Sequence, residues 1–379
     1  MSDSATSLID RALSVREQGD FDQAIQNLQS AVEIEPDNVQ AIGELAITLG
    51  QAGQLPAAIE VLDAAINQRP DEPWLLTNRA IARGLAGRFE ESVADFDRAV
   101  KLNPNDPILM ASRADTKRVM GRLEEAAADF TTALRLDPSM IGVLVGRGDI
   151  FREIGNYDQA LADFDAVISQ DGGNPEAYAC RGEVFRIQGK FEEAELDFNR
   201  ALEISPGFES ATMSRAITFR QAGRLEEALQ DFTNLIEIYG ESPVALSGRG
   251  ETLRQQSQFE AALADFDRAL ELDDQDAAAL AGRGETYRRM YEYERALEDF
   301  DQAILLEDQD GWIIARRAET YRQLDRCEEA LVDFHRAIEL DPDDTWAVTG
   351  RGNTYRQMGR FLEASEDLQR SGDRQQNAS

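Results

Sequence analysis

GRGETYRR, residues 282–289, is one of a series of related segments in the chain. GRGDIFRE begins at Gly146, CRGEVFRI at Cys180, GRGETLRQ at Gly248 and GRGNTYRQ at Gly350, so the copies are separated by 34 residues or by multiples of 34. A glycine-rich phosphate loop normally occurs once, between a strand and a helix. A segment that recurs at a fixed period instead indicates a repeat architecture, in which each copy is one structural module.

The composition limits the classes of partner and the compartment. The chain has 379 residues and a net charge of −33, from 72 acidic and 39 basic residues. This charge argues against nucleic acid, where neutralising phosphates supplies most of the affinity, and against an anionic membrane surface. No apolar run approaches the roughly 20 residues of a membrane span, and the N-terminal stretch lacks an apolar signal segment. We therefore expect no membrane insertion and a cytoplasmic location.

The residue types that usually carry catalysis are scarce. His335 is the single histidine, and the two cysteines, Cys180 and Cys327, lie far apart in the sequence. They indicate neither a disulfide framework nor a metal cluster, and no Cys–His pair recurs. We expect no enzyme activity, no catalytic or metal-binding residues and no cofactor.

The whole chain can be divided into repeats of the same length. Eleven repeats start at residues 5, 39, 73, 107, 141, 175, 209, 243, 277, 311 and 345, forming a single continuous array over 5–374 and leaving 375–379 as a polar tail. Apolar residues within each repeat follow helical spacing; in the repeat from 277 this predicts helices over 278–290 and 293–306. The turn between the helices carries glycine in eight repeats, and glycine accepts the left-handed conformation that ends a helix.

Small and aromatic residues recur at fixed places in the repeats. The eighth place holds only glycine or alanine in the later repeats, as in Gly284 and Ala318. Because glycine within a helix costs about 1 kcal/mol relative to alanine, we infer that two helix backbones come close there. Alanines such as Ala296 and Ala303 occupy the twentieth and twenty-seventh places. The twenty-fourth place holds Phe96, Phe130, Phe164, Phe198, Phe232, Phe266, Phe300 and Phe334.

This pattern resembles the tetratricopeptide repeat, and the resemblance covers nearly the whole chain. It includes aromatic residues at the eleventh place, such as Tyr287, and proline at the thirty-second place of several repeats. The resemblance implies an all-α fold in which antiparallel helix pairs stack into a right-handed superhelical solenoid. It also implies a concave groove lined by the first helices. Family members are mostly scaffolds that bind proteins or peptides, so we expect a non-enzymatic protein–protein interaction scaffold.

One departure from the family pattern links two places of the repeat. Arginine replaces the usual leucine at the seventh place in all nine repeats from 73 onward, and all nine carry aspartate at the twenty-third place. The repeat from 39 has neither, since Leu45 and Val61 stand there. A half-buried guanidinium needs an anion nearby, so we expect contact within a repeat or between neighbours. The alternative is that duplication preserved both residues without contact.

A second set of charged residues should face the groove. The twelfth place holds Arg118, Arg152, Arg186, Arg220, Arg254, Arg288, Arg322 and Arg356, and the ninth place is usually acidic, at Asp115, Asp149, Glu183, Glu251, Glu285 and Glu319. These residues either bind an extended peptide through charge-assisted hydrogen bonds or pair along their own helices. Ile217 and Asn353 interrupt the acidic series, which makes Arg220 and Arg356 the better candidates for a ligand anion.

Two tryptophans and the chain ends leave further alternatives. Trp312 and Trp346 occupy the second place of adjacent repeats; they are either packing residues or an aromatic anchor for a partner. Acidic residues crowd the turns and loops, where they form a solvated rim or a docking site for a basic partner. A self-assembling array, built by end-to-end or lateral association, is the alternative function, because Leu368 is expected to lie partly exposed.

Overall fold

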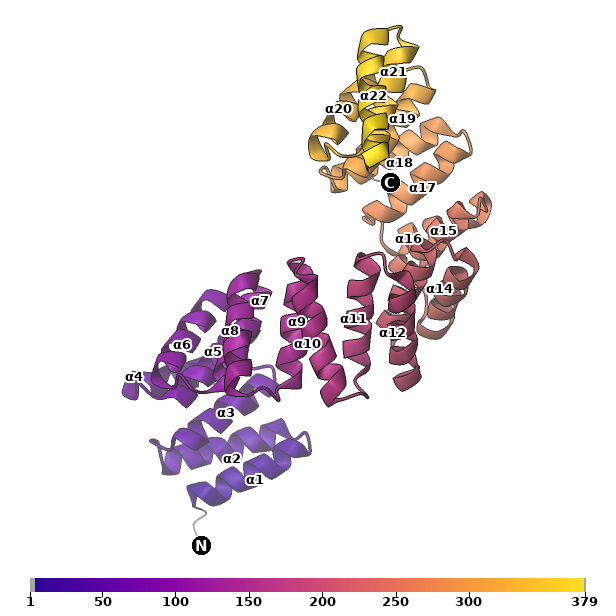
Figure 1. Cartoon of the computed structure of the whole chain (residues 1–379). Coiled ribbons are helices and arrows are strands. Elements are labelled where there is room, and N and C mark those ends of the chain that lie inside the picture. Colours follow the sequence, from indigo (N-terminus) through magenta and orange to yellow (C-terminus); the bar gives the residue numbers. More distant parts are fainter. Residues whose placement is uncertain (1–3, 378–379) are drawn as a thin grey trace. The chain divides into compact units, whose positions relative to one another are not determined.

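A computed structural model of the chain describes residues 4–377, and these residues form 22 α-helices arranged as successive antiparallel pairs (Figure 1). The first helices of the pairs are α1 (Ala5–Glu17), α3 (Val39–Gln51), α5 (Pro73–Leu85), α7 (Pro107–Val119), α9 (Ile141–Glu153), α11 (Pro175–Ile187), α13 (Glu209–Gln221), α15 (Pro243–Gln255), α17 (Ala277–Arg289), α19 (Gly311–Gln323) and α21 (Thr345–Gln357). The second helices are α2 (Phe21–Ile34), α4 (Leu55–Gln68), α6 (Phe89–Leu102), α8 (Leu123–Leu136), α10 (Tyr157–Gln170), α12 (Phe191–Ile204), α14 (Leu225–Tyr239), α16 (Phe259–Leu272), α18 (Tyr293–Leu306), α20 (Cys327–Leu340) and α22 (Phe361–Asn377). The predicted all-α solenoid of paired helices is confirmed.

The helix boundaries follow the sequence period. All eleven first helices begin at the residue from which the repeat was counted. The last helix differs from expectation, because α22 continues to Asn377, past the predicted end of the array at 374. The residues after Gly372 include arginine and glutamine, which favour helix. The rest of the predicted tail, 378–379, lies outside the described residues.

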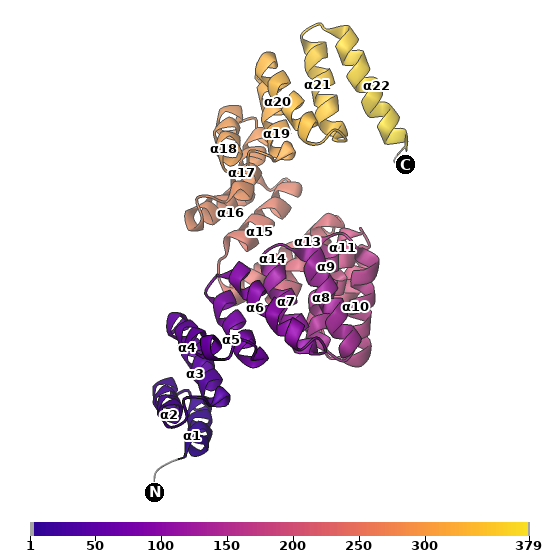
Figure 2. The ribbon, with the colours of Figure 1, turned by 90° about the vertical axis from the view of Figure 1, so that its left-hand side faces the viewer.

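The chain divides into two compact bodies, Met1–Val184 and Phe185–Ser379, which we call the N-terminal and C-terminal bodies. In the N-terminal body α1 packs against α2 and α2 against α3, and the same succession continues to α10 (Figures 1 and 2). In the C-terminal body the succession runs from α12 to α22. The continuity of one array over all eleven repeats stays a prediction.

Phenylalanines and alanines of the second helices recur through the cores of both bodies, together with aliphatic residues of both helices of each pair. The eight phenylalanines at the twenty-fourth place are at most 2% exposed, and Ala296 and Ala303 are completely buried. Burying a phenylalanine side chain stabilises the fold by about 2 kcal/mol. The predicted packing role of these places is confirmed.

The two glycines of the GRG segment at 282–284 lie against different phenylalanine rings. A Cβ added to Gly284, at the eighth place, would lie 3.1 Å from the Phe300 ring of the same repeat. A Cβ added to Gly282, at the sixth place, would lie 2.6 Å from the Phe266 ring of the preceding repeat. The close neighbour at the eighth place is thus mainly a side chain rather than the helix backbone that we inferred from the sequence. Glycine is needed because an aromatic ring fills the space of its missing Cβ.

Arginine and aspartate at the seventh and twenty-third places form bidentate ion pairs inside eight repeats. The arginine Nε and Nη2 donate to the two carboxylate oxygens at 2.6–2.9 Å. The pairs are Arg79–Asp95, Arg113–Asp129, Arg147–Asp163, Arg215–Asp231, Arg249–Asp265, Arg283–Asp299, Arg317–Asp333 and Arg351–Asp367. The ninth pair, Arg181 and Asp197, is divided between the two bodies. The predicted contact is confirmed for these eight repeats.

The remaining nitrogen of the same arginines reaches the preceding repeat. In seven repeats Nη1 donates to a side chain at the twenty-fifth place of that repeat, at 2.6–3.0 Å. The acceptors are Asp63, Asp97, Thr131, Asp165, Asn199, Asp267 and Asp301. Each of these guanidinium groups therefore connects two successive repeats. The sequence left within-repeat and between-repeat contact open, and both occur.

The turns between paired helices require a left-handed residue. The eight predicted turn glycines have φ values from 72° to 84°: Gly19, Gly53, Gly87, Gly121, Gly155, Gly189, Gly223 and Gly359. Three further repeats place a side chain in the same conformation, at Ser257 (φ 61°), Tyr291 (φ 65°) and Asp325 (φ 60°). The fixed length of the turn sets this conformation, and these three residues adopt it against their own preference.

Replacing Tyr291 with glycine is expected to raise the free energy of unfolding by about 1 kcal/mol, because a residue with a Cβ is strained in the left-handed region. The Tyr291 side chain is 78% exposed, so little packing is lost. Urea denaturation followed by circular dichroism measures the change. Gly155→Ala is the matched control and should lower stability by a similar amount. A less stable Tyr291→Gly variant would show that the ring contributes more than the strain costs.

Candidate partner-binding groove

The ninth and twelfth places of the first helices define a surface on each body, which we call the first-helix face of that body. In five repeats the arginine and the acid on this face pair along their own helix. The pairs are Arg118–Asp115 (3.8 Å), Arg152–Asp149 (2.6 Å), Arg254–Glu251 (2.8 Å), Arg288–Glu285 (2.7 Å) and Arg322–Glu319 (2.6 Å). In these repeats the guanidinium is already paired with a carboxylate. This favours pairing along each helix over ligand binding, and we call the series of pairs the ladder.

Glu285 is the most buried acid of this ladder. Its side chain is 2% exposed and accepts hydrogen bonds from Arg288 and Arg289, and Arg254 lies 3.8 Å away. Burial opposes ionisation of Glu285, but the hydrogen bonds from Arg288 and the surrounding arginines outweigh it and lower its pKa. Glu285 therefore stays charged and holds three arginines on the first-helix face.

The ladder is interrupted where the sequence places Ile217 and Asn353. Arg220 is half-buried, and its Nε is buried without a hydrogen-bond partner among the described residues. Burial lowers the pKa of Arg220, against the attraction of Glu251. Arg356 is exposed on α21. Both arginines thus lack the carboxylate at the ninth place that the other repeats provide.

Two predicted residues lie on α11, where the two bodies meet in sequence. Glu183, in the N-terminal body, and Arg186, in the C-terminal body, are both half-buried. Arg186 donates to Gln221 of α13 at 2.9 Å. This bond links the first helices of successive repeats.

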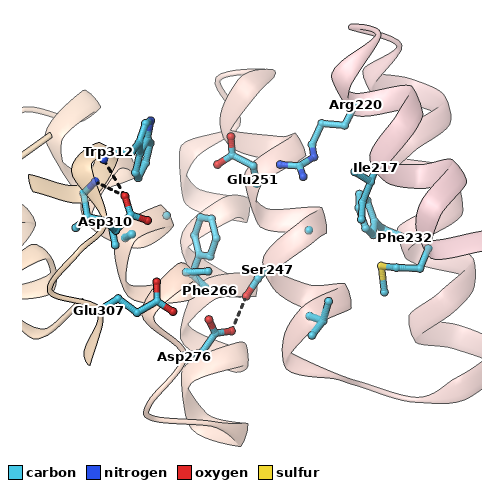
Figure 3. A pocket seen from close by; sticks show the side chains of 17 residues that line it. Ile217, Arg220, Phe232, Ser247, Glu251, Phe266, Asp276, Glu307, Asp310 and Trp312 are labelled. Carbon is cyan, nitrogen blue, oxygen red and sulfur yellow. Dashed lines mark hydrogen bonds between the residues drawn. The ribbon is translucent and has the colours of Figure 1, made fainter. Parts of the chain in front are cut away.

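A hollow of about 390 Å³ lies on the first-helix face of the C-terminal body (Figure 3). Its lining comes from α13 to α17, from α19 and from the loops before α17 and α19. Arg220, Glu251 and Trp312 all project from different helices around it (Figure 3). The structure therefore brings three of the predicted site residues together in one place.

The floor of the hollow is apolar and its rim on one side is acidic. Apolar residues such as Ile217 and Val244 line it, together with Gly248 and Gly282. The rim carries three acids from loops and helix starts, which are Asp276, Glu307 and Asp310. The Oδ1 atoms of Asp276 and Asp310 cap α17 and α19, and Oδ2 of Asp276 accepts from Ser247 at 3.3 Å. Helix capping fixes two of the three acids in position.

A stack of three side chains joins α19 to α21. The Arg316 guanidinium lies 5.1 Å from the ring centre of Trp312 and 3.8 Å from that of Trp346. Trp346 also lies 6.4 Å from Phe334. Trp312 and Trp346 remain 42% and 37% exposed. Each tryptophan thus packs against a neighbouring side chain and also keeps part of its surface exposed to solvent.

Sequence reasoning missed Arg316, and it did not place the loop acids at a hollow. The sixth place is glycine, serine or cysteine in most later repeats. The arginine at 316 is an exception, and this difference could have marked it as a residue with a special contact. Asp276, Glu307 and Asp310 belong to the loop acids for which the sequence left open a solvated rim or a docking site for a basic partner. The burial of Cys180, which raises its thiol pKa to about 12, makes that residue a poor nucleophile.

Three models described as tetratricopeptide repeat match the chain. One matches residues 15–77, one matches 77–141, 145–207 and 247–311, and one matches 313–344. The second model alone covers more than half of the chain. The chain belongs to the tetratricopeptide repeat family. Proteins of this family use their stacked helices as interaction surfaces and generally lack catalytic activity. A search of curated proteins found no match.

Solved structures with the same fold are only distantly similar in sequence. A tetratricopeptide repeat protein from Parabacteroides merdae is 23% identical with a TM-score of 0.57, over 64% of this chain and 96% of that one. Yeast Tom70 is 17% identical with a TM-score of 0.53, over 98% and 96% of the two chains. A chain of the APC/C hetero-tetramer Cut9–Hcn1 is 16% identical with a TM-score of 0.57, over 92% and 76%. At these identities the similarity shows the tetratricopeptide fold alone.

Proposed function

We propose that this tetratricopeptide repeat protein is a non-enzymatic scaffold that binds a partner protein or peptide on its first-helix face. Arg220 carries the proposal. Its half-buried guanidinium lies over a hollow with an apolar floor, and its Nε has no hydrogen-bond partner among the described residues. A buried donor without an acceptor costs free energy, and a partner whose carbonyl or carboxylate accepts from the Arg220 guanidinium at the hollow would offset that cost.

The other predicted residues have graded roles in this proposal. Arg356 and the exposed faces of Trp312 and Trp346 are available to a partner. The first-helix face of each body is shaped by the paired residues, which offer their remaining donors and acceptors. They are Arg118 and Arg152 in the N-terminal body and Arg254, Arg288, Arg322, Glu251, Glu285 and Glu319 in the C-terminal body. Glu183 belongs to the face of the N-terminal body and Arg186 to that of the C-terminal body. Exposed aromatic and arginine side chains dominate many protein interfaces, so we place most of the binding energy on Arg220 and the tryptophans.

Affinity capture with matched variants tests the proposal. The wild type, Arg220→Ala/Arg356→Ala and the control Arg135→Ala/Arg370→Ala are used as baits in extracts of the source organism. Both control arginines are exposed, on the second helices α8 and α22. We expect at least one protein to be captured by the wild type and the control and lost with the groove variant. Identical capture by all three baits would contradict the proposal.

Light scattering separates the scaffold from the self-assembling array. A molar mass that stays constant with concentration is expected for the scaffold. A mass that rises with concentration would favour the array. The exposed Phe361 and Leu362 of α22 are the first residues to replace in that case.

The cellular context follows from charge and helix character. Within residues 4–377, none of the helices combines the length and the apolar character that crossing a bilayer requires. The cytoplasmic location and the absence of nucleic-acid partners and cofactors stay predictions from the sequence.

A further inference from the structure

The hollow on the C-terminal body has a definite shape because of the glycines at the sixth place. Gly248 and Gly282 line it, and the rings of Phe232 and Phe266 lie directly behind them, where a Cβ would come within 2.4 Å and 2.6 Å. In the repeat from 311 the same place holds Arg316, whose guanidinium stacks on the tryptophans. The two repeats that form the floor of the hollow thus both have glycine at the sixth place. Its volume of about 390 Å³ falls in the range of ligand sites.

The charges around the hollow are unequal. Its lining contains the carboxylates of Glu251, Asp276, Glu307 and Asp310 and a single guanidinium, that of Arg220. Glu251 already pairs with Arg254. The other three acids lie on the side of the hollow away from Arg220, with Asp310 next to Trp312, Glu307 below it and Asp276 beside Ser247 (Figure 3). Carboxylates next to an indole ring attract a cation through ion pairing and cation–π contact.

We propose that this hollow binds an extended peptide segment in which a bulky apolar residue is followed or preceded by arginine or lysine. The inference rests on the proposed scaffold function and names the partner chemistry of that same face. The apolar side chain lies on the floor over Gly248 and Gly282, and the basic side chain reaches the acidic rim at Asp276, Glu307 and Asp310. Arg220 donates to a main-chain carbonyl of the peptide.

Charge complementarity decides between basic and acidic occupants. An acidic side chain on the rim would meet three carboxylates and gain contact only with Arg220, which Glu251 already attracts. A basic side chain meets opposite charge at the rim, and the net charge of −33 draws a basic segment to the protein. Like charges placed together at an interface cost affinity, so the hollow rejects acidic peptides.

Three matched peptides test the proposal by fluorescence anisotropy. Each is labelled, has blocked termini and carries a Leu-Phe pair followed by two residues, which are both Arg, both Gln or both Glu. We expect the Arg peptide to bind about tenfold more tightly than the Glu peptide, with the Gln peptide between them. Raising the salt concentration should reduce the preference, because the ion pairs at the rim are screened.

Two variants of the hollow and one control assign the binding to this site. Ala278 is exposed and lines the hollow, so Ala278→Trp fills it and should weaken the Arg peptide at least about tenfold. Glu307→Gln should weaken the Arg peptide about threefold and leave the Gln peptide unchanged. Ala261→Trp introduces the same residue at an exposed position of α16 outside the lining and should change nothing.

The outcomes separate this inference from the function on which it rests. Tighter binding of the Glu peptide, undiminished binding to Ala278→Trp, or no binding of the Arg peptide at about 1 mM would each overturn the inference. The capture experiment with Arg220→Ala/Arg356→Ala judges the scaffold function separately. A partner lost from that variant but retained by Ala278→Trp would uphold the scaffold and reject the peptide site.

Discussion

Asp299→Val is expected to lower the free energy of unfolding by about 3 to 5 kcal/mol, because it removes one side of a buried ion pair. Asp299 is 4% exposed and accepts from Nε and Nη2 of Arg283 at 2.9 and 2.7 Å. Hydrogen bonding to Asp299 and Asp267 raises the pKa of Arg283, although burial opposes it. The variant leaves Arg283 charged and without its main partner.

The double variant Asp299→Val/Arg283→Leu should recover much of this loss. The repeat from 39 carries Leu45 and Val61 at the same two places, so the fold accepts an apolar pair there. Urea denaturation of the two single variants and the double variant gives the coupling energy. Strictly additive effects would contradict a direct interaction. Asp267→Asn, at a side chain that is 52% exposed, is the control and should change stability by less than about 1 kcal/mol.

Gly350→Ala is expected to destabilise the protein by about 2 kcal/mol, although alanine favours helix. The added Cβ would lie 2.4 Å from the ring of Phe334, which is completely buried and packs on Trp346. Moving this ring disturbs two repeats, since Phe334 belongs to the repeat before Gly350. Thermal denaturation followed by circular dichroism measures the change.

Replacing a second glycine is the matched control, and its expected effect on stability has the opposite sign. Gly142 lies near the start of α9, and a Cβ there would meet nothing within 4 Å. Gly142→Ala should therefore raise stability by about 0.5 kcal/mol. Replacing Phe334 with leucine in the Gly350→Ala variant should restore part of its loss by making room. A neutral or stabilising Gly350→Ala would show that the ring moves without cost.

The period of the sequence made the helices and the ion pairs predictable. Because all nine repeats from 73 onward have both the arginine at the seventh place and the aspartate at the twenty-third, and the repeat from 39 has neither, contact could be inferred without a structure; the first repeat, with Arg11 and Asn27, has a neutral side chain in place of the aspartate. The same comparison between repeats marked Arg220 and Arg356, where Ile217 and Asn353 break the acidic series. A feature can thus be predicted from a single sequence when it shows as a difference between repeats at the same place of the repeat.

Features that depend on where a side chain points were not predictable. The direction of Nη1 in Arg317 toward Asp301 follows from how adjacent helices are offset. The stacking of Arg316 between two tryptophans depends on side-chain rotamers. Glu307 looked like any other loop acid, and only the fold places it beside Trp312 at the hollow.

The bonds from Nη1 give each body a polarity along the chain. Every such arginine reaches toward the N-terminus, so losing the neighbour on that side costs a residue such as Arg317, whose side chain is only 18% exposed, one of its bonds and leaves only its pair with Asp333. Losing the neighbour on the other side leaves Asp301, which is 52% exposed and is easily hydrated. Unfolding should therefore spread more readily from the N-terminus to the C-terminus than in reverse. A partner that binds and stabilises an earlier repeat would also stabilise the repeat that follows it.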